Sequence, residues 1–151
     1  MRRFSLVVAA VALAACGTKE QPAADTSAAA APPPGISLSD VAGAWTAKVM
    51  RMDSDSVILT YDLSASADPT AWTITFPGGR PPVPMRAMAD GDSIVVDAGP
   101  YESALRKGVQ VSTHGAMRLV NGELVGTTTA HYQVKTADSV VTLRTVATKK
   151  P

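Results

Sequence analysis

The chain of 151 residues has one cysteine, two histidines and few aromatic side chains, which make up 5% of it. With Cys16 alone it cannot form an internal disulfide or a zinc site built from several thiolates. Its charges nearly balance, at 14 Lys and Arg against 13 Asp and Glu. No basic stripe points to nucleic acid, and Lys149-Lys150 is interpreted as a solvated tail. A folded domain in this chain must therefore be held together by its apolar core.

The N-terminus has the features of a secretory signal peptide. Arg2 and Arg3 give it a positive start, and an apolar segment follows from Phe4 to Ala15. That segment is too short to cross a bilayer, which takes about 17–25 residues. Small residues stand before the expected cleavage point, so we predict a signal peptide over residues 1–15.

The segment ends in Leu13-Ala14-Ala15-Cys16, which resembles the lipobox of bacterial lipoproteins. In that family the cysteine sulfur carries a diacylglyceryl group and becomes the first residue of the mature chain. The resemblance implies lipidation at Cys16 and anchoring to the membrane of the cell envelope. Gly17 in place of Asp implies the periplasmic face of the outer membrane in a diderm cell. The alternative is an ordinary signal peptide with a chance cysteine near its end.

A spacer follows the cysteine. Residues 18–35 are mostly Ala, Pro, Ser and Thr, and they include the run Pro32-Pro33-Pro34. Such a segment has too little bulky apolar surface to offset the entropy lost on ordering. We therefore expect residues 16–37 to be a disordered tether, which the proline run keeps extended.

From Leu38 onward, apolar side chains alternate with polar ones, the period of a strand with one buried face. The pattern predicts about eight strands, near residues 45–50, 57–63, 72–76, 83–88, 93–98, 109–120, 123–134 and 139–147. Turn pairs such as Asp90-Gly91 and Asn121-Gly122 suit tight hairpins. No connection is long enough for a crossover helix, so the strands should be antiparallel. The predicted fold class is all-β, an up-and-down meander forming a small barrel over residues 38–148.

Two segments depart from this pattern. Pro100 to Gly108 has proline near its start and glycine after its end, which predicts a short helical turn. The proline-rich stretch from Arg80 to Pro84 cannot supply a full ladder of hydrogen bonds. We therefore expect an edge or gap there, with the barrel imperfectly closed.

The best-determined hairpin turns at Asn121-Gly122, which pairs Val120 with Glu123 and so fixes the register of both strands. The more apolar face should point inward. Its pairs are Leu119–Leu124, Met117–Gly126, Gly115–Thr128, Thr113–Ala130 and Val111–Tyr132.

The middle of this inward face has small side chains, at Thr113, Gly115, Thr128 and Ala130. Either large side chains from other strands fill the space, as close packing favours, or a cavity for a small apolar ligand remains. The candidate ligand-lining residues are Trp45, Tyr61, Trp72, Phe76, Thr113, Gly115, Thr128, Ala130 and Tyr132.

Gly43-Ala44-Trp45, at the start of the first predicted strand, resembles the Gly-x-Trp signature of lipocalin and other calycin barrels. In that family the tryptophan closes one barrel end, and an arginine of the last strand packs over its ring. The resemblance covers Leu38 to Ala147 and implies that Arg144 is this partner. The chain is shorter than most lipocalins and has neither the family disulfide nor a helix after the last strand. These departures favour a compact lipocalin-like domain over a deep ligand cavity.

The sequence offers little for catalysis or metal binding. In the predicted register His114 and His131 are diagonal neighbours on the outer face, and two ligands are too few for a metal site. A combination of Ser103, His114 and Asp97 lacks the Gly-x-Ser-x-Gly elbow that presents a nucleophile. Asp53-Ser54-Asp55 has only a fragment of a calcium loop. We therefore expect no enzyme, no catalytic residue, no metal and no cofactor.

Two function classes remain. The domain binds a small apolar ligand or lipid at the envelope, or it is a structural or protein-interaction module with a filled core. The second class would use a strand edge near Pro81 to Pro84 or the outer face around His114 and His131. The sequence identifies no protein partner.

Overall fold

The computed structural model describes residues 35–151. The predicted signal peptide, the lipidation site Cys16 and nearly all of the predicted tether lie outside the described residues. Within residues 35–151, no helix is long and apolar enough to pass through a bilayer.

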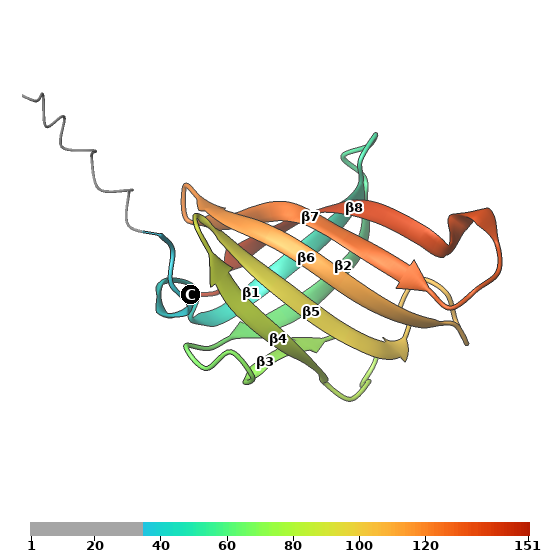
Figure 1. Cartoon of the computed structure of the whole chain (residues 1–151), viewed down its shortest axis with the longest axis horizontal. Coiled ribbons are helices and arrows are strands. Elements are labelled where there is room, and N and C mark those ends of the chain that lie inside the picture. Colours follow the sequence, from blue (N-terminus) through green and yellow to red (C-terminus); the bar gives the residue numbers. More distant parts are fainter. Residues whose placement is uncertain (1–34) are drawn as a thin grey trace, which may run out of the picture. The chain divides into compact units, whose positions relative to one another are not determined.

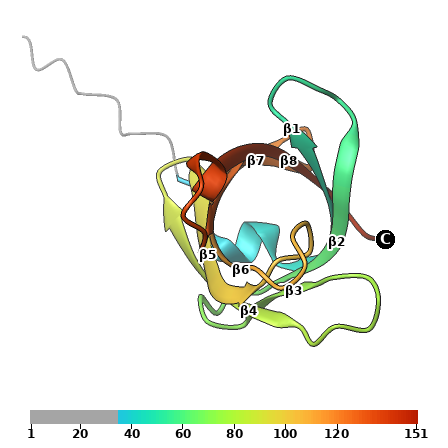
Figure 2. The ribbon, with the colours of Figure 1, turned by 90° about the vertical axis from the view of Figure 1, so that its right-hand side faces the viewer.

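Residues 35–151 form a closed barrel of eight antiparallel strands, each paired with the next and β8 paired with β1 (Figures 1 and 2). The predicted all-β meander is confirmed. The strands are β1 (Gly43–Arg51), β2 (Val57–Ala65), β3 (Trp72–Thr75), β4 (Val83–Asp90), β5 (Ser93–Glu102), β6 (Gln110–Val120), β7 (Glu123–Tyr132) and β8 (Val140–Lys149). The described chain also has two short 3₁₀ helices, η1 (Leu38–Val41) and η2 (Ala137–Ser139).

The β6–β7 hairpin has the register that its turn predicts. Val120 lies opposite Glu123, and the pairing continues residue by residue to Val111 opposite Tyr132. Asn121 and Gly122 have φ angles of 51° and 83°, as a tight hairpin turn requires. On the predicted inward face Leu119 is 40% exposed, and Thr113, Gly126 and Thr128 are half-buried. The other six residues of this face are buried: Val111, Gly115, Met117, Leu124, Ala130 and Tyr132.

The expected gap at the proline-rich stretch is wrong, because the ladder continues through it. Pro84 lies opposite Thr73, and Val83 lies opposite Ile74. Pro81 and Pro82 precede β4, so among the prolines of this stretch only Pro84 sits within a strand. One missing N–H donor is tolerated there, between two strands whose pairing is only three residues long.

The expected helical turn from Pro100 to Gly108 is also wrong. β5 runs on to Glu102 through a bulge between Ala98 and Tyr101, where Gly99 has a φ of 112°. A bulge lets a strand accommodate a proline without ending. Residues 103–109 then form a turn in which the Ser103 Oγ accepts hydrogen bonds from the backbone N–H groups of Leu105 and Arg106, both at 3.0 Å.

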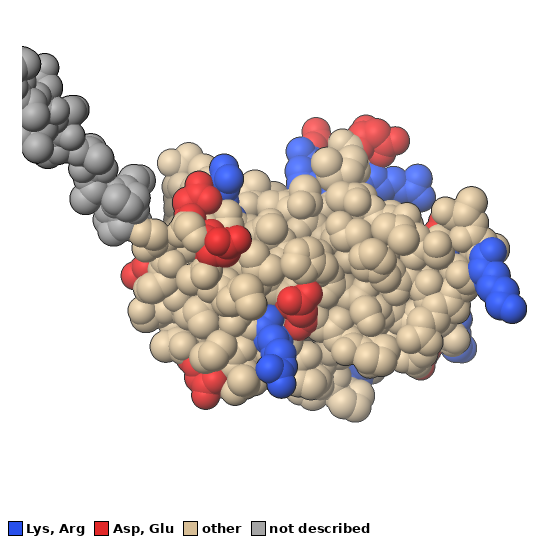
Figure 3. Space-filling view, in the orientation of Figure 1, with Lys and Arg blue, Asp and Glu red and all other residues tan. Residues whose placement is uncertain are grey.

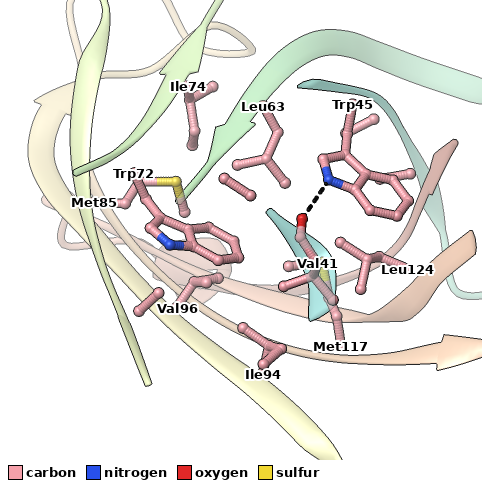
Figure 4. Packing of buried hydrophobic residues seen from close by; sticks show 14 of the residues in the cluster. Val41, Trp45, Leu63, Trp72, Ile74, Met85, Ile94, Val96, Met117 and Leu124 are labelled. Carbon is pink, nitrogen blue, oxygen red and sulfur yellow. Dashed lines mark hydrogen bonds between the residues drawn. The ribbon is translucent and has the colours of Figure 1, made fainter. Parts of the chain in front are cut away.

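The η1 end of the barrel is closed and tightly packed (Figure 4). η1 lies across this end, where the Trp45 indole N–H donates to the Val41 carbonyl at 2.8 Å. The Trp72 indole N–H donates to the Ser66 carbonyl at 2.7 Å. Both indoles are almost fully buried, at 1% and 0% exposure, and both have satisfied their one donor. The described chain begins beside this end, where the Ile36 N–H donates to the Gly91 carbonyl at 3.0 Å.

Candidate functional site

The interior contains a cavity of about 50 Å³ away from η1, toward the mouth that Figure 2 faces. Its walls come from strands all around the barrel and from the start of the β5–β6 loop. No charged side chain of the described residues lines it. The lining residues are Val49, Leu59, Tyr61, Ile74, Phe76, Met85, Val96, Tyr101, Ser103, Ala104, Leu105, Val111, Thr113, Gly115, Met117, Thr128, Ala130, Tyr132 and Leu143.

Large side chains from other strands fill most of the space left by the small residues of β6 and β7. The rings of Tyr61 and Phe76 meet edge to face with centroids 5.7 Å apart, and Tyr101 lies 5.7 Å from Phe76 on its other side. At Gly115, a Cβ would come within 2.9 Å of Val96 Cγ2, so this glycine makes room for the valine. Of the two alternatives, filling therefore dominates, and a small residual cavity remains.

Hydroxyl groups give the cavity a polar component without charge. Burial raises the pKa of Tyr61 far above its ordinary value, and burial also raises that of Tyr101, despite a hydrogen bond with Thr113 that lowers it. Both phenols therefore stay neutral at ordinary pH. Thr128 and Thr145 share a hydrogen bond of 2.9 Å, and Thr145 has no exposed surface. Such a wall suits an uncharged molecule with few polar groups.

Seven of the nine candidate ligand-lining residues surround this cavity: Tyr61, Phe76, Thr113, Gly115, Thr128, Ala130 and Tyr132. Whether they bind a ligand stays a prediction. Trp45 and Trp72 do not line it, because both are packed beneath η1 at the closed end. Tyr101 and Leu105 are not among the predicted lining residues, because the helical turn predicted for residues 100–108 takes them out of the strand pattern. The inward period of β5, continued past the bulge, is the signal that points to Tyr101.

The expected contact between Arg144 and the Trp45 ring is not what the structure shows. Trp45 lies directly opposite Lys149, whose Nζ is 5.5 Å from the ring centroid. Arg144 lies opposite Met50, with its guanidinium paired to Asp55 and 3.6 Å from the Met50 Sδ. The β1–β8 register thus makes Lys149 the cation that meets the tryptophan.

Gly43 fits the expected signature position at the start of β1, with a φ of 134°. A Cβ there would lie 3.0 Å from the Lys149 Cε, so the glycine leaves room for the lysine stem beside Trp45. The end-closing role implied for Trp45 agrees with its position under η1.

The two histidines lie on the outer face of the barrel. The His114 Nδ1 is 2.7 Å from the Asp97 Oδ1 across the β5–β6 pair, and His131 is opposite Ser112. Ser103 lines the interior, so it does not join His114 and Asp97. Among residues 35–151, no three histidine, cysteine, aspartate or glutamate side chains gather as metal ligands would. On the face shown in Figure 3, charged side chains are few and scattered.

No protein-family model, curated protein or solved structure matches this chain. What the cavity can do therefore follows from its own residues, which provide an uncharged, largely apolar wall with phenol and threonine hydroxyls.

Proposed function

We propose that this protein is a lipid-anchored, non-enzymatic protein of the cell envelope whose barrel binds a small uncharged apolar ligand or lipid chain. The observation that carries the proposal is the cavity at the mouth end, which no charged side chain of the described residues lines. The Gly-x-Trp element beneath η1 supports it by its likeness to lipocalin barrels. The lipobox-like sequence before Cys16 supports the anchor.

The size of the cavity limits the ligand. Pockets for small molecules usually enclose about 300–1,000 Å³, whereas this cavity has about 50 Å³. Only a few non-hydrogen atoms fit without movement of the wall. A larger ligand needs the mouth to open, and the rigid ladders of the strands leave the loops as the parts that can move.

The binding proposal is tested by identifying what the protein carries. The full chain, gently extracted from its native membrane, is examined by native mass spectrometry for a bound small molecule. Ala130→Leu fills the cavity, and Thr129→Leu places the same side chain on the outer face of the same strand. We expect the wild type and Thr129→Leu to carry a ligand and Ala130→Leu to carry none. Repeated absence of any ligand from the wild type would count against the proposal.

The anchor is tested separately. Cys16→Ser removes the only sulfur that can accept a diacylglyceryl group, and we expect the protein to move from the membrane fraction to the soluble fraction. Equal membrane association of the wild type and Cys16→Ser would contradict lipid anchoring.

The alternative is a structural or protein-interaction module of the envelope. The observation that favours it is the small size of the cavity, about 50 Å³, because a nearly filled barrel has little room for a ligand. The ligand experiment distinguishes the two, since this alternative predicts no difference between Ala130→Leu and Thr129→Leu.

A further inference from the structure

Three residues separate the interior cavity from an outer groove of about 600 Å³. Leu105, Tyr132 and Leu143 line both spaces. Tyr132 and Leu143 belong to paired strands, so they cannot leave without breaking the barrel. Leu105 is in the β5–β6 loop, which reaches over the barrel opening in Figure 2. Of these three residues, Leu105 alone lies outside a strand.

The groove outside this partition is itself partly apolar. Met52, Ile58 and Leu105 line it and are 59%, 37% and 39% exposed. Its charged lining residues balance, with Arg51 and Arg106 against Asp53 and Asp138. Neither side of the partition therefore favours a ligand with net charge.

The loop from Ser103 to Gly108 is held mainly by its own hydrogen bonds. Its ends are joined by the Ser103 N–H, which donates to the Val109 carbonyl at 2.8 Å. The Gly108 N–H donates to the Glu102 Oε1 at 3.1 Å. With the two bonds to the Ser103 hydroxyl, these contacts fold the loop upon itself.

One side chain ties this loop to the facing wall. The Arg106 guanidinium lies 4.0 Å above the centre of the Tyr132 ring, and its Nη2 is 2.8 Å from the Asp138 Oδ2 in η2. The Arg106 side chain is 28% exposed and the Asp138 side chain 60%, so solvent partly screens this ion pair and keeps it modest in strength.

We propose that residues Ser103–Gly108 form a gate, that Arg106 latches it to Tyr132 and Asp138, and that its opening joins the cavity to the groove. The site then takes an elongated, uncharged apolar molecule, with one end among the cavity hydroxyls and the other along Met52 and Ile58. This inference rests on the proposed ligand-binding function, whose site it completes.

The latch is tested without any ligand. Amide hydrogen exchange is measured by mass spectrometry on the full chain in lipid nanodiscs, for peptides that cover residues 103–109. Arg106→Ala and Asp138→Asn each break the latch, and Arg118→Ala breaks the comparable exposed ion pair with Asp92 at the other end of the barrel. We expect Arg106→Ala to speed exchange in the loop about tenfold, because it removes both an ion pair and a cation–π contact. Asp138→Asn should have a smaller effect.

The ligand is tested with 1-decanol, an elongated uncharged probe, followed by NMR shifts of the same samples. Leu105→Ala and Arg106→Ala should bind it more tightly than the wild type, and Arg118→Ala should equal the wild type. Loop exchange that is no faster in Arg106→Ala than in Arg118→Ala overturns the gate. If Arg106→Ala speeds loop exchange but no variant binds decanol, the ligand-binding function is overturned. The role of Arg106 as a latch on the loop is then still supported.

Discussion

The two ends of this barrel are built from different side chains. At the η1 end, Trp45 and Trp72 are buried among aliphatic residues, and each indole N–H bonds a backbone carbonyl. Toward the mouth, the inward positions of β6 and β7 have Thr113, Gly115 and Thr128, and the β5–β6 loop reaches over the opening (Figure 2). One small barrel thus has close packing at one end and its unfilled volume at the other.

The physical basis is the distribution of side-chain volume. Bulky residues that bury apolar surface dominate the stability of a small domain. The closed end therefore has most to lose from truncation. The mouth has less to lose, because its wall already borders an unfilled space. Substitutions at the two ends should therefore differ in their cost to stability.

Trp72→Ala should have the largest effect, because it leaves a cavity in the closed end. Replacing a buried tryptophan by alanine costs about 3–5 kcal/mol of unfolding free energy. Val140→Ala, at a residue 53% exposed, is the control and should change it by less than about 0.5 kcal/mol. Urea denaturation followed by circular dichroism measures both. A loss below about 1 kcal/mol for Trp72→Ala would show that the η1 end is not the stabilising one.

Substitution by alanine should cost more stability at Gly126 than at Gly115, the two glycines of the β6–β7 pair. A Cβ at Gly126 would lie 1.9 Å from the Ala116 carbonyl oxygen, a backbone atom, whereas at Gly115 it meets the end of the Val96 side chain at 2.9 Å. Gly126→Ala should therefore cost about 2–3 kcal/mol and Gly115→Ala about 1 kcal/mol or less. The same urea experiment compares them. Equal losses would mean that the space beside Gly115 is as fully packed as that beside Gly126.

A hydrogen-bonded threonine pair, with Thr128 in the cavity wall and Thr145 fully buried, tests the polar part of that wall. Thr145→Val leaves the Thr128 hydroxyl without its 2.9 Å partner and should cost about 1–2 kcal/mol. The double variant Thr128→Val/Thr145→Val removes both hydroxyls and should recover most of that loss. Thermal unfolding of the two variants is the measurement. A double variant less stable than the single one would contradict this account of the pair.

The smallest expected effect is the pH dependence of the stabilisation that Asp138 provides. The pKa of Asp138 is lowered from 3.8, first by a hydrogen bond from Thr136 and further by Arg106. Because the folded-state pKa is depressed, the stabilisation is present above pH 3.8 and disappears as pH falls through the folded-state pKa. The difference in urea midpoint between the wild type and Asp138→Asn should be small at pH 6 and vanish under strong acid. A difference that grows on acidification would contradict the sign.

The sequence predicted correctly those features that neighbouring residues determine. The Asn121-Gly122 turn sets the register of β6 and β7, because a two-residue loop leaves no freedom in pairing. Pro100 and Gly108 fit a helical turn by their local positions, but pairing of β5 with β6 keeps Tyr101 and Glu102 in the sheet. Tertiary pairing outweighs local preference in such a segment.

The pairing of β1 with β8, which closes the barrel, could not be predicted from local sequence patterns. Whether Arg144 or Lys149 meets Trp45 depends on the register between the first and last strands, which no turn connects. The volume left inside depends on how Tyr61, Phe76 and Tyr101 pack together, and side-chain packing is not encoded in an alternation of apolar and polar residues.

Ligand binding at the mouth end is tested most directly by an NMR titration of the full chain in lipid nanodiscs with 1-decanol. A ligand held at the mouth end should shift the amide signals of Gly115, Leu105 and Ala130 and leave the two indole N–H signals of Trp45 and Trp72 unchanged. Shifts centred on the indole signals, or a titration that leaves the three amide signals unchanged, would contradict binding at the mouth end.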